Sequence, residues 1–305
     1  MTADSLDQRA SASPTRADHV PLGIAYMLAA TVLFSASSAV SKWQVAKYSF
    51  VDVVFLRSVA ALAICTLLIL PRTGLGVFRT RKLGAHIGRN VTQGIAQAFI
   101  VIAFGLMPLA GAVAINFSAP LVATLASALL LKEKVGPVRW SVLIIGFLGV
   151  LVVAAPGADS FRLGALFALA NAVMYGTVIA AVRGMTATES TETLTMYQMV
   201  ILCALFALML PFSFTMPNAH DAGVMLFNGV LYGLGQYVWT RSLSLAPTSA
   251  VGPFYYFTLV WAIVIGFIFW GDMPTLPLLA GSAIVVGSGL YLLWHESGRK
   301  PMTAE

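Results

Sequence analysis

Long apolar stretches alternate with short polar connections along almost the whole chain. A helix needs about 20 predominantly apolar residues to cross about 30 Å of hydrocarbon, and ten stretches approach this length. They are residues 21–41, 52–70, 90–106, 110–131, 138–154, 163–182, 194–212, 222–243, 248–270 and 275–294. This pattern predicts ten transmembrane helices in one membrane domain, with polar tails at 1–20 and 295–305.

The composition agrees with an all-α integral membrane protein. Hydrophobic residues make up 59% of the chain and charged residues 10%, against about 25% charged residues in soluble domains. The two cysteines, Cys65 and Cys203, lie in apolar runs, so neither a disulfide framework nor a thiolate metal site is supported. The sequence lacks H-E-x-x-H, P-loop and G-x-S-x-G motifs and is not expected to be an enzyme or to hold a metal or cofactor.

The positive charges predict the orientation in the membrane. With the N terminus inside, fourteen of the 18 Lys and Arg residues lie in cytoplasmic segments or span ends, three lie outside and Arg57 lies within a span. Cytoplasmic loops carry such an excess, so both termini are predicted to be cytoplasmic. The N-terminal tail has no hydrophobic run before the first span and does not resemble a cleaved signal peptide. The net charge of +6 needs no nucleic-acid partner.

The chain contains a weak internal repeat. Residues 22–42 (LGIAYMLAATVLFSASSAVSK) align with 163–183 (LGALFALANAVMYGTVIAAVR), and further along GIAQ at 94–97 aligns with GLGQ at 233–236. These matches divide the membrane domain into repeats at 21–154 and 163–294. Five spans per repeat give the halves opposite polarity, and inverted repeats place a substrate site near the bilayer midplane. The pattern favours a carrier with alternating access, and a channel or receptor is the alternative.

Several motifs recur in both halves. Each has a leading LG helix and a polar residue in its second helix, Arg57 or Gln198. Each also has a proline before its fourth helix and an acidic residue after it: Pro108 and Pro247, Glu133 and Asp272. In these features the chain resembles the drug/metabolite transporter superfamily, more narrowly the EamA-like family and its YddG-type amino-acid exporters.

The resemblance implies a cavity lined by the first, third and fourth helices of each half, in a protein of the bacterial inner membrane. It also implies export of small metabolites. The second half departs from the family pattern, because Leu259 occupies the position that corresponds to Pro120 in the first half.

Polar residues line one face of the third and eighth predicted helices. Asn90, Gln93 and Gln97 recur at helical spacing, as do Asn228, Tyr232, Gln236 and Trp239. The alternative reading is that these groups only bond helix to helix. Their symmetric placement and the nearby aromatic residues favour a site for a small amphipathic solute. The predicted substrate-binding residues are Gln93, Gln97, Asn116, Asn171, Tyr175, Tyr232, Gln236, Trp239, Tyr255, Thr258 and Trp261.

Two cations, Arg57 and Lys42, are predicted near the outer side of the membrane. Arg57 lies five residues into its predicted helix, so its long side chain is expected to reach the outer interface and bind carbonyls or headgroups. The alternative is a group that attracts substrate carboxylates at the outer mouth. Lys42, at the outer end of the first helix, is the nearest other cation.

Prolines, glycines and titratable residues complete the prediction. Pro108, Pro120 and Pro247 provide either hinges or bundle shape. The glycines of the fifth and tenth helices allow close helix packing or a subunit contact, in a monomer or weak homodimer. All four histidines are expected in tails or loops, and the spans lack deep carboxylates. The lack of deep carboxylates favours export or exchange without a proton relay. The resemblance implies amino acids, including those with apolar or aromatic side chains, as the cargo; a multidrug or other metabolite exporter is the alternative.

Overall fold

The computed structural model describes residues 20–122, 125, 137–154, 159–185, 188–245 and 251–297. This part of the chain is entirely helical. Its α-helices are α2 (Val20–Val45), α3 (Phe50–Thr73), α4 (Leu83–Leu106), α5 (Leu109–Asn116), α7 (Pro137–Val153), α8 (Asp159–Met185), α9 (Thr191–Ser213), α10 (Ala219–Leu245), α12 (Phe257–Trp270) and α13 (Leu276–Ser297). Two 3₁₀-helices, η1 (Gly74–Phe78) and η2 (Gly252–Tyr256), precede α4 and α12. Most of both predicted tails, Glu133 and Pro247 lie outside the described residues.

Each of the ten predicted spans contains one of these α-helices, which confirms the predicted fold class. Several helices are longer than their apolar stretches: α4 begins at Leu83, seven residues before the predicted start. The fourth span is interrupted instead. Helix α5 ends at Asn116, a turn at Phe117 and Ser118 follows, and helical structure resumes at Ala119. Pro120 therefore lies in the first turn of a new helical segment, where its missing N–H costs least.

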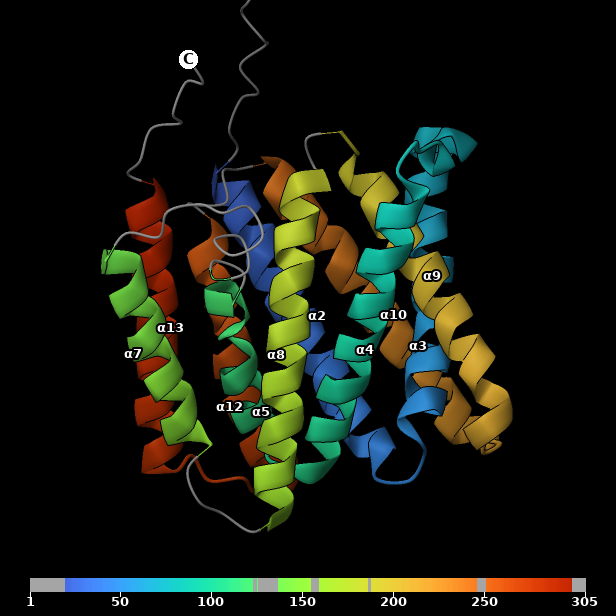
Figure 1. Cartoon of the computed structure of the whole chain (residues 1–305). Coiled ribbons are helices and arrows are strands. Elements are labelled where there is room, and N and C mark those ends of the chain that lie inside the picture. The colour runs from blue at the N-terminus through green and yellow to red at the C-terminus, as the bar shows by residue number, and fades with distance from the viewer. Residues whose placement is uncertain are drawn as a thin grey trace, which may run out of the picture.

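The helices stand side by side between two faces of the molecule (Figure 1). Helix α2 begins and α13 ends at the same face, which we call the terminal face; the connections from α2 to α3 and from α12 to α13 lie at the opposite, distal face. Helix α8 starts at the distal face, so it runs opposite to α2. This is the inverted arrangement that an odd number of spans per half requires.

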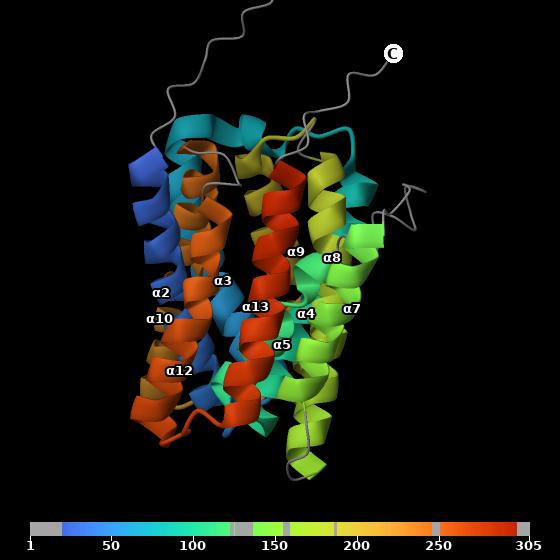
Figure 2. The ribbon, with the colours of Figure 1, turned by 90° about the vertical axis from the view of Figure 1, so that its left-hand side faces the viewer.

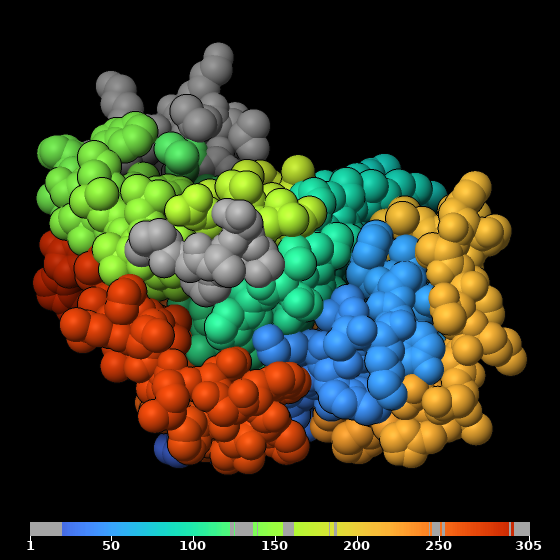
Figure 3. Space-filling view, turned by 90° about the horizontal axis from the view of Figure 1, so that it is seen from below, coloured from blue at the N-terminus to red at the C-terminus, as the bar shows by residue number. Residues whose placement is uncertain are grey.

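The helices form a central group with a pair at each end. Helices α3 and α9 lie at one end and α7 and α13 at the other, with α2, α4, α5, α8, α10 and α12 between them (Figures 1 and 2). The view onto the distal face shows the same order (Figure 3). The first, third and fourth helices of each half therefore occupy the middle of the bundle.

Large apolar side chains cover much of the outer surface. On α7, Ile144, Leu148 and Leu151 are all more than half exposed. Four helices among the described residues have the length and hydropathy to cross a membrane: Val20–Val45, Phe50–Phe78, Arg162–Val182 and Thr191–Ser213. Four shorter apolar helices accompany them, Leu109–Val122, Trp140–Val153, Phe254–Trp270 and Leu276–Leu292. The surface is typical of a bundle solvated by lipid, because it leaves apolar rather than polar groups outside.

Glycines let neighbouring helices touch at their backbones. A Cβ on Gly281 of α13 would lie 2.7 Å from the carbonyl oxygen of Gly149 on α7, and 2.6 Å from Cγ2 of Val153. A Cβ on Gly289 would collide with the hydroxyl of Tyr256. These contacts assign the glycines to packing within one chain, one of the two roles predicted for them. Gly287 faces open space instead.

Candidate substrate-binding site

Arg57 points into the bundle. Its side chain is only 4% exposed, and its guanidinium donates to Oε1 of Gln97 (2.7 Å) and Oγ of Ser41 (3.3 Å). It also lies over the ring of Tyr232, 4.7 Å from the ring centre. The expectation that Arg57 extends to the outer interface is therefore wrong. Polar side chains of α2, α4 and α10 replace the water that the guanidinium would otherwise need.

Arg57 has no carboxylate partner among the described residues. The ion pairs found there join Lys47 or His220 to Asp221, and His86 to Glu189. The Nε atom of Arg57 also lacks a hydrogen-bond partner. A buried guanidinium in this state is costly unless an anion compensates its charge. The position is therefore suited to an anionic group of a ligand.

Two glycines on α10 place Arg57 beside Tyr232. A Cβ on Gly229 would collide with the carbonyl oxygen of Arg57, and one on Gly233 would lie 3.0 Å from Cα of Ala61. Small residues four positions apart allow such backbone contact between membrane helices. The α3 backbone therefore lies directly on α10, and the side chain of Arg57 reaches the ring of the tyrosine between the two glycines.

The polar faces predicted for the third and eighth helices meet at this point. Nε2 of Gln97 on α4 donates to the hydroxyl of Tyr232 on α10, at 3.3 Å. Phe34 of α2 packs against the same tyrosine, with ring centres 6.0 Å apart. Gln97, Tyr232 and Arg57 thus form one cluster, which we call the guanidinium cluster. It joins three helices that are far apart in sequence.

Two further tyrosines lie close to this cluster. Tyr175 belongs to α8 and Tyr255 to η2. Tyr175, Tyr232 and Tyr255 are all half-buried. Phe117 meets the ring of Tyr255 edge to face, with centres 5.9 Å apart.

Other predicted binding residues are engaged in helix contacts. Asn171 of α8 donates to Oδ1 of Asn116 on α5 at 2.6 Å, and Nε1 of Trp261 donates to Thr31 at 3.2 Å. The carbonyl of Thr258 accepts from Ser35. Trp239 packs in a cluster with Met27 and Val251, away from the guanidinium cluster. Gln93 is buried on α4, and Gln236 is half-buried on α10.

The remaining predicted residues lie at helix ends. Lys42 donates to the carbonyl of Met107 (2.7 Å) and of Phe104 (3.3 Å), so it caps the negative end of α4 rather than standing free at an outer mouth. Pro108 occupies the cap position that begins α5. In this place it terminates one helix and starts the next, and it introduces no kink within a helix.

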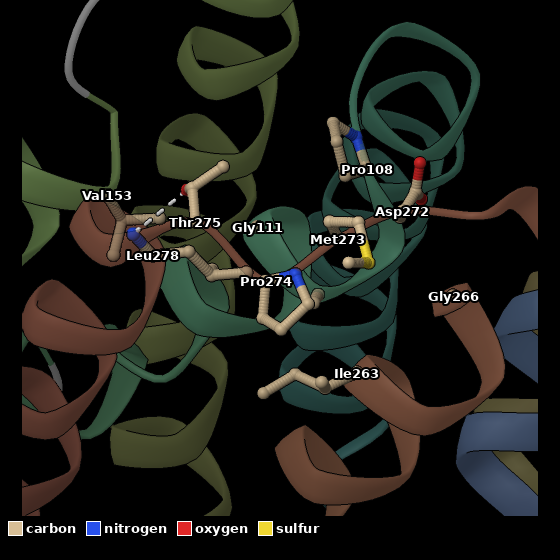
Figure 4. A pocket seen from close by; sticks show the side chains of 11 residues that line it. Pro108, Gly111, Val153, Ile263, Gly266, Asp272, Met273, Pro274, Thr275 and Leu278 are labelled. Atoms are coloured by element: carbon tan, nitrogen blue, oxygen red, sulfur yellow. Dashed lines mark hydrogen bonds between the residues drawn. The ribbon is translucent and has the colours of Figure 1, made fainter.

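A small cavity opens near Pro108 at the distal face (Figure 4). It lies between the α4–α5 and α12–α13 connections and is bordered by Asp272 and Pro274. Its volume of about 90 Å³ is far below the roughly 300–1,000 Å³ of small-molecule sites. The cavity is therefore too small for a metabolite, and no residue of the guanidinium cluster lines it.

Polar contacts also tie the distal ends of the helices together. Tyr48, between α2 and α3, donates to Oδ2 of Asp221 at 2.7 Å, and Lys47 lies 3.6 Å from the same oxygen. The bonds from Tyr48 and His220 hold the pKa of Asp221 below its usual value, and the bond to Asp221 raises the pKa of Tyr48. These contacts connect the first half of the chain to the start of α10.

Several polar residues of the bundle were missed from the sequence. Ser37, Ser41 and Gln44 recur on one face of α2 and bond to Asn228; this spacing was a usable signal. His86 was expected in a loop, but it lies in the first turn of α4 and its side chain is fully buried. The loop prediction was wrong because the helix continues beyond the apolar stretch that defined the span.

Comparison with known proteins gives the family. The profile of the EamA-like transporter family matches residues 21–155 and 162–294. A riboflavin transporter of Rhizobium johnstonii is 27% identical, over 92% of this chain and 93% of its own length. An S-adenosylmethionine uptake transporter of Rickettsia conorii is 20% identical, over 90% and 93%. The pseudopaline exporter CntI of Pseudomonas aeruginosa is 27% identical, over 92% and 99%.

A crystal structure with 21% sequence identity superposes with a TM-score of 0.64, covering 91% of this chain and 99% of that chain. The family expected from the sequence is thus confirmed, while the narrower likeness to amino-acid exporters is not specifically supported by these relatives. The chain belongs to the EamA-like transporter family and is a multi-pass membrane protein, a secondary transporter of small metabolites and not an enzyme.

Proposed function

We propose that the protein exports small amphipathic metabolites that carry a carboxylate, in particular amino acids with apolar or aromatic side chains. The observation that supports this is the buried guanidinium of Arg57, which has no carboxylate partner among the described residues. It lies beside residues of the polar faces that the repeat relates, Gln97 and Tyr232. Alternating access of the two inverted halves would carry the substrate across.

The chemistry of the cluster fits such a substrate. A carboxylate can accept two parallel hydrogen bonds from a guanidinium, and it would take the place of the carbonyl of Gln97 and compensate the buried charge. The rings of Tyr175, Tyr232 and Tyr255 offer apolar surface with hydroxyl groups for the rest of the molecule. The charge distribution supports an inner-membrane orientation with the terminal face in the cytoplasm.

Counterflow in liposomes tests this proposal. Vesicles loaded with unlabelled amino acids should take up labelled phenylalanine, methionine or threonine saturably. In Arg57→Gln, phenylalanine uptake should fall at least about tenfold, since a lost charge-assisted bond costs about 1.5–3 kcal/mol. Arg57→Lys should retain part of the activity, because it keeps the charge and loses the planar fork.

Arg72→Gln is the matched control. Arg72 belongs to the same helix, but it is exposed and bonds to Tyr237, so this variant should transport normally. Thermal midpoints in detergent show whether each variant folds. Absence of amino-acid counterflow by the folded wild-type protein would overturn the proposed cargo.

A second candidate cargo is riboflavin. It is favoured by three relatives named riboflavin transporters, each 26% or 27% identical to this chain. Riboflavin has no carboxylate but has a planar ring system that could stack on Tyr232 or Phe34, which lie side by side. Saturable riboflavin counterflow that Arg57→Gln leaves nearly unchanged, together with no phenylalanine counterflow, would identify riboflavin as the cargo.

A further inference from the structure

Helix α4 carries a polar stripe along its length. His86, Asn90, Gln93 and Gln97 follow each other at spacings of four, three and four residues, so their side chains share one face of the helix. The first three are buried in the protein. The stripe leads from His86 at the terminal face to Gln97 in the guanidinium cluster. This polar face of α4 therefore runs from the guanidinium cluster to the terminal face.

His86 lies at the terminal-face end of this stripe. Its environment is unusual for a histidine. Its side chain is 0% exposed, and neither ring nitrogen has a hydrogen-bond partner in the part of the chain that the structure describes. Oε2 of Glu189, in the connection from α8 to α9, lies 3.6 Å from Nε2. The other carboxylate oxygen accepts a bond from Thr80 at 2.7 Å. The imidazole ring stacks on Tyr197 of α9, with centres 4.3 Å apart.

The surrounding charges determine which form of His86 this arrangement favours. Glu189 on the α8–α9 connection attracts a protonated ring, whereas Arg89, one turn further along α4, repels it. Tyr197 on α9 is the remaining titratable group in contact with it. A buried imidazolium is costly unless it is hydrogen-bonded, and Glu189 is beyond hydrogen-bond distance. The arrangement therefore suits the neutral ring.

We propose that His86 and Glu189 form a proton-operated gate at the terminal-face end of the α4 stripe. A proton from water at that face binds Nε2 of His86, and the resulting imidazolium favours an arrangement in which the ring reaches water. This moves the ring of His86 away from Glu189 and opens the stripe; release of the proton to the same water closes it. The inference builds on the proposed function, in which the stripe leads to the substrate.

Cysteine labelling tests the gate without any substrate. In a Cys65→Ala, Cys203→Ala background, Gln93→Cys reports access to the stripe. Gly84→Cys is its matched control, because Gly84 lies in the same helix and a side chain there meets nothing within 4 Å. Labelling by a small methanethiosulfonate reagent is measured at pH 8 and pH 6, with equal pH on both sides of the membrane. Each rate at position 93 is divided by the rate at position 84 at the same pH.

The ratio is expected to rise several-fold from pH 8 to pH 6 in the presence of His86. In His86→Gln the ratio should not change with pH. If the gate does not exist, the ratio should not change with pH in the parent either. Glu189→Gln removes the carboxylate that attracts the imidazolium in the buried arrangement, so it should enlarge the rise between pH 8 and pH 6. A smaller rise in this variant than in the parent would contradict the gate, so the test does not depend on the folding of His86→Gln. His295→Gln, which changes another histidine of the terminal face, should behave like the parent.

A pH-independent ratio in the parent, or an unchanged rise in His86→Gln, would overturn the gate. Because the labelling uses no substrate, this result is distinct from failure of the proposed function. That failure would appear as a wild-type protein with normal labelling behaviour but no amino-acid counterflow.

Discussion

Asn228 organises the buried polar contacts between α2 and α10. It accepts from Ser37 at 2.6 Å and donates to Ser41 (2.9 Å) and Gln44 (3.2 Å), and its side chain is fully buried. Asn228→Ala would leave these partners unpaired, which costs about 1–3 kcal/mol for a buried group. The thermal midpoint in detergent should fall by several degrees. Ser41 also accepts from Arg57, so Arg57 should become less well positioned.

Ser141→Ala provides the comparison for this residue. Ser141 is exposed, and its hydroxyl donates to the carbonyl of Pro137 one turn earlier. Its loss should leave the midpoint unchanged within error. Equal midpoints for Asn228→Ala and Ser141→Ala would contradict a structural role for the Asn228 network.

At the scale of helices, the contact between α7 and α13 depends on one glycine. Gly281→Ala would press a methyl group against the backbone of Gly149 and the side chain of Val153. The helices must then move apart, and overpacking of this kind costs about 1–3 kcal/mol. Gly287→Ala in the same helix meets nothing within 4 Å and should be neutral or slightly stabilising. The thermal midpoints of Gly281→Ala and Gly287→Ala measure this difference. Similar midpoints would be evidence against backbone contact between α7 and α13.

At the scale of the whole molecule, the apolar outer surface must remain in lipid. Leu148 lies on α7 and is 53% exposed, so Leu148→Lys would place a charge in the hydrocarbon at a cost of about 2.5–3.5 kcal/mol. The yield of folded protein in membranes should fall. Leu75→Lys is the control: Leu75 is even more exposed, at 74%, but it lies in η1 at the terminal face. Equal yields would show that α7 does not face lipid.

The fold could be predicted from the sequence because the constraint of the bilayer is so strong. Ten apolar stretches of nearly constant length are enough to specify ten helices, and the repeat gives their relative direction. Helix ends were harder to predict. His86 and Arg89 belong to α4 although they precede its apolar stretch, because polar residues without a proline among them can continue the backbone hydrogen bonds of a helix beyond the hydrocarbon.

The guanidinium cluster was predicted only in part, and for a different reason. Spacing placed Gln97 and Tyr232 on polar faces, but it cannot show that α3 lies directly against α10. That contact depends on Gly229 and Gly233, and it turns Arg57 inward. The side chain of Arg57 is long enough to reach either the interface or the interior of the bundle. It points inward because its hydrogen-bond and ring partners lie on α2, α4 and α10.

The lone charge of Arg57 has a kinetic consequence. Without cargo, the protein must change access with a buried guanidinium that no carboxylate among the described residues compensates, whereas in the proposed function a bound amino acid places its carboxylate against that guanidinium. Reorientation without cargo should therefore be the slow step of the cycle. The protein would then work as an exchanger, so that external amino acid accelerates the exit of labelled amino acid from preloaded vesicles well above the rate of exit into plain buffer.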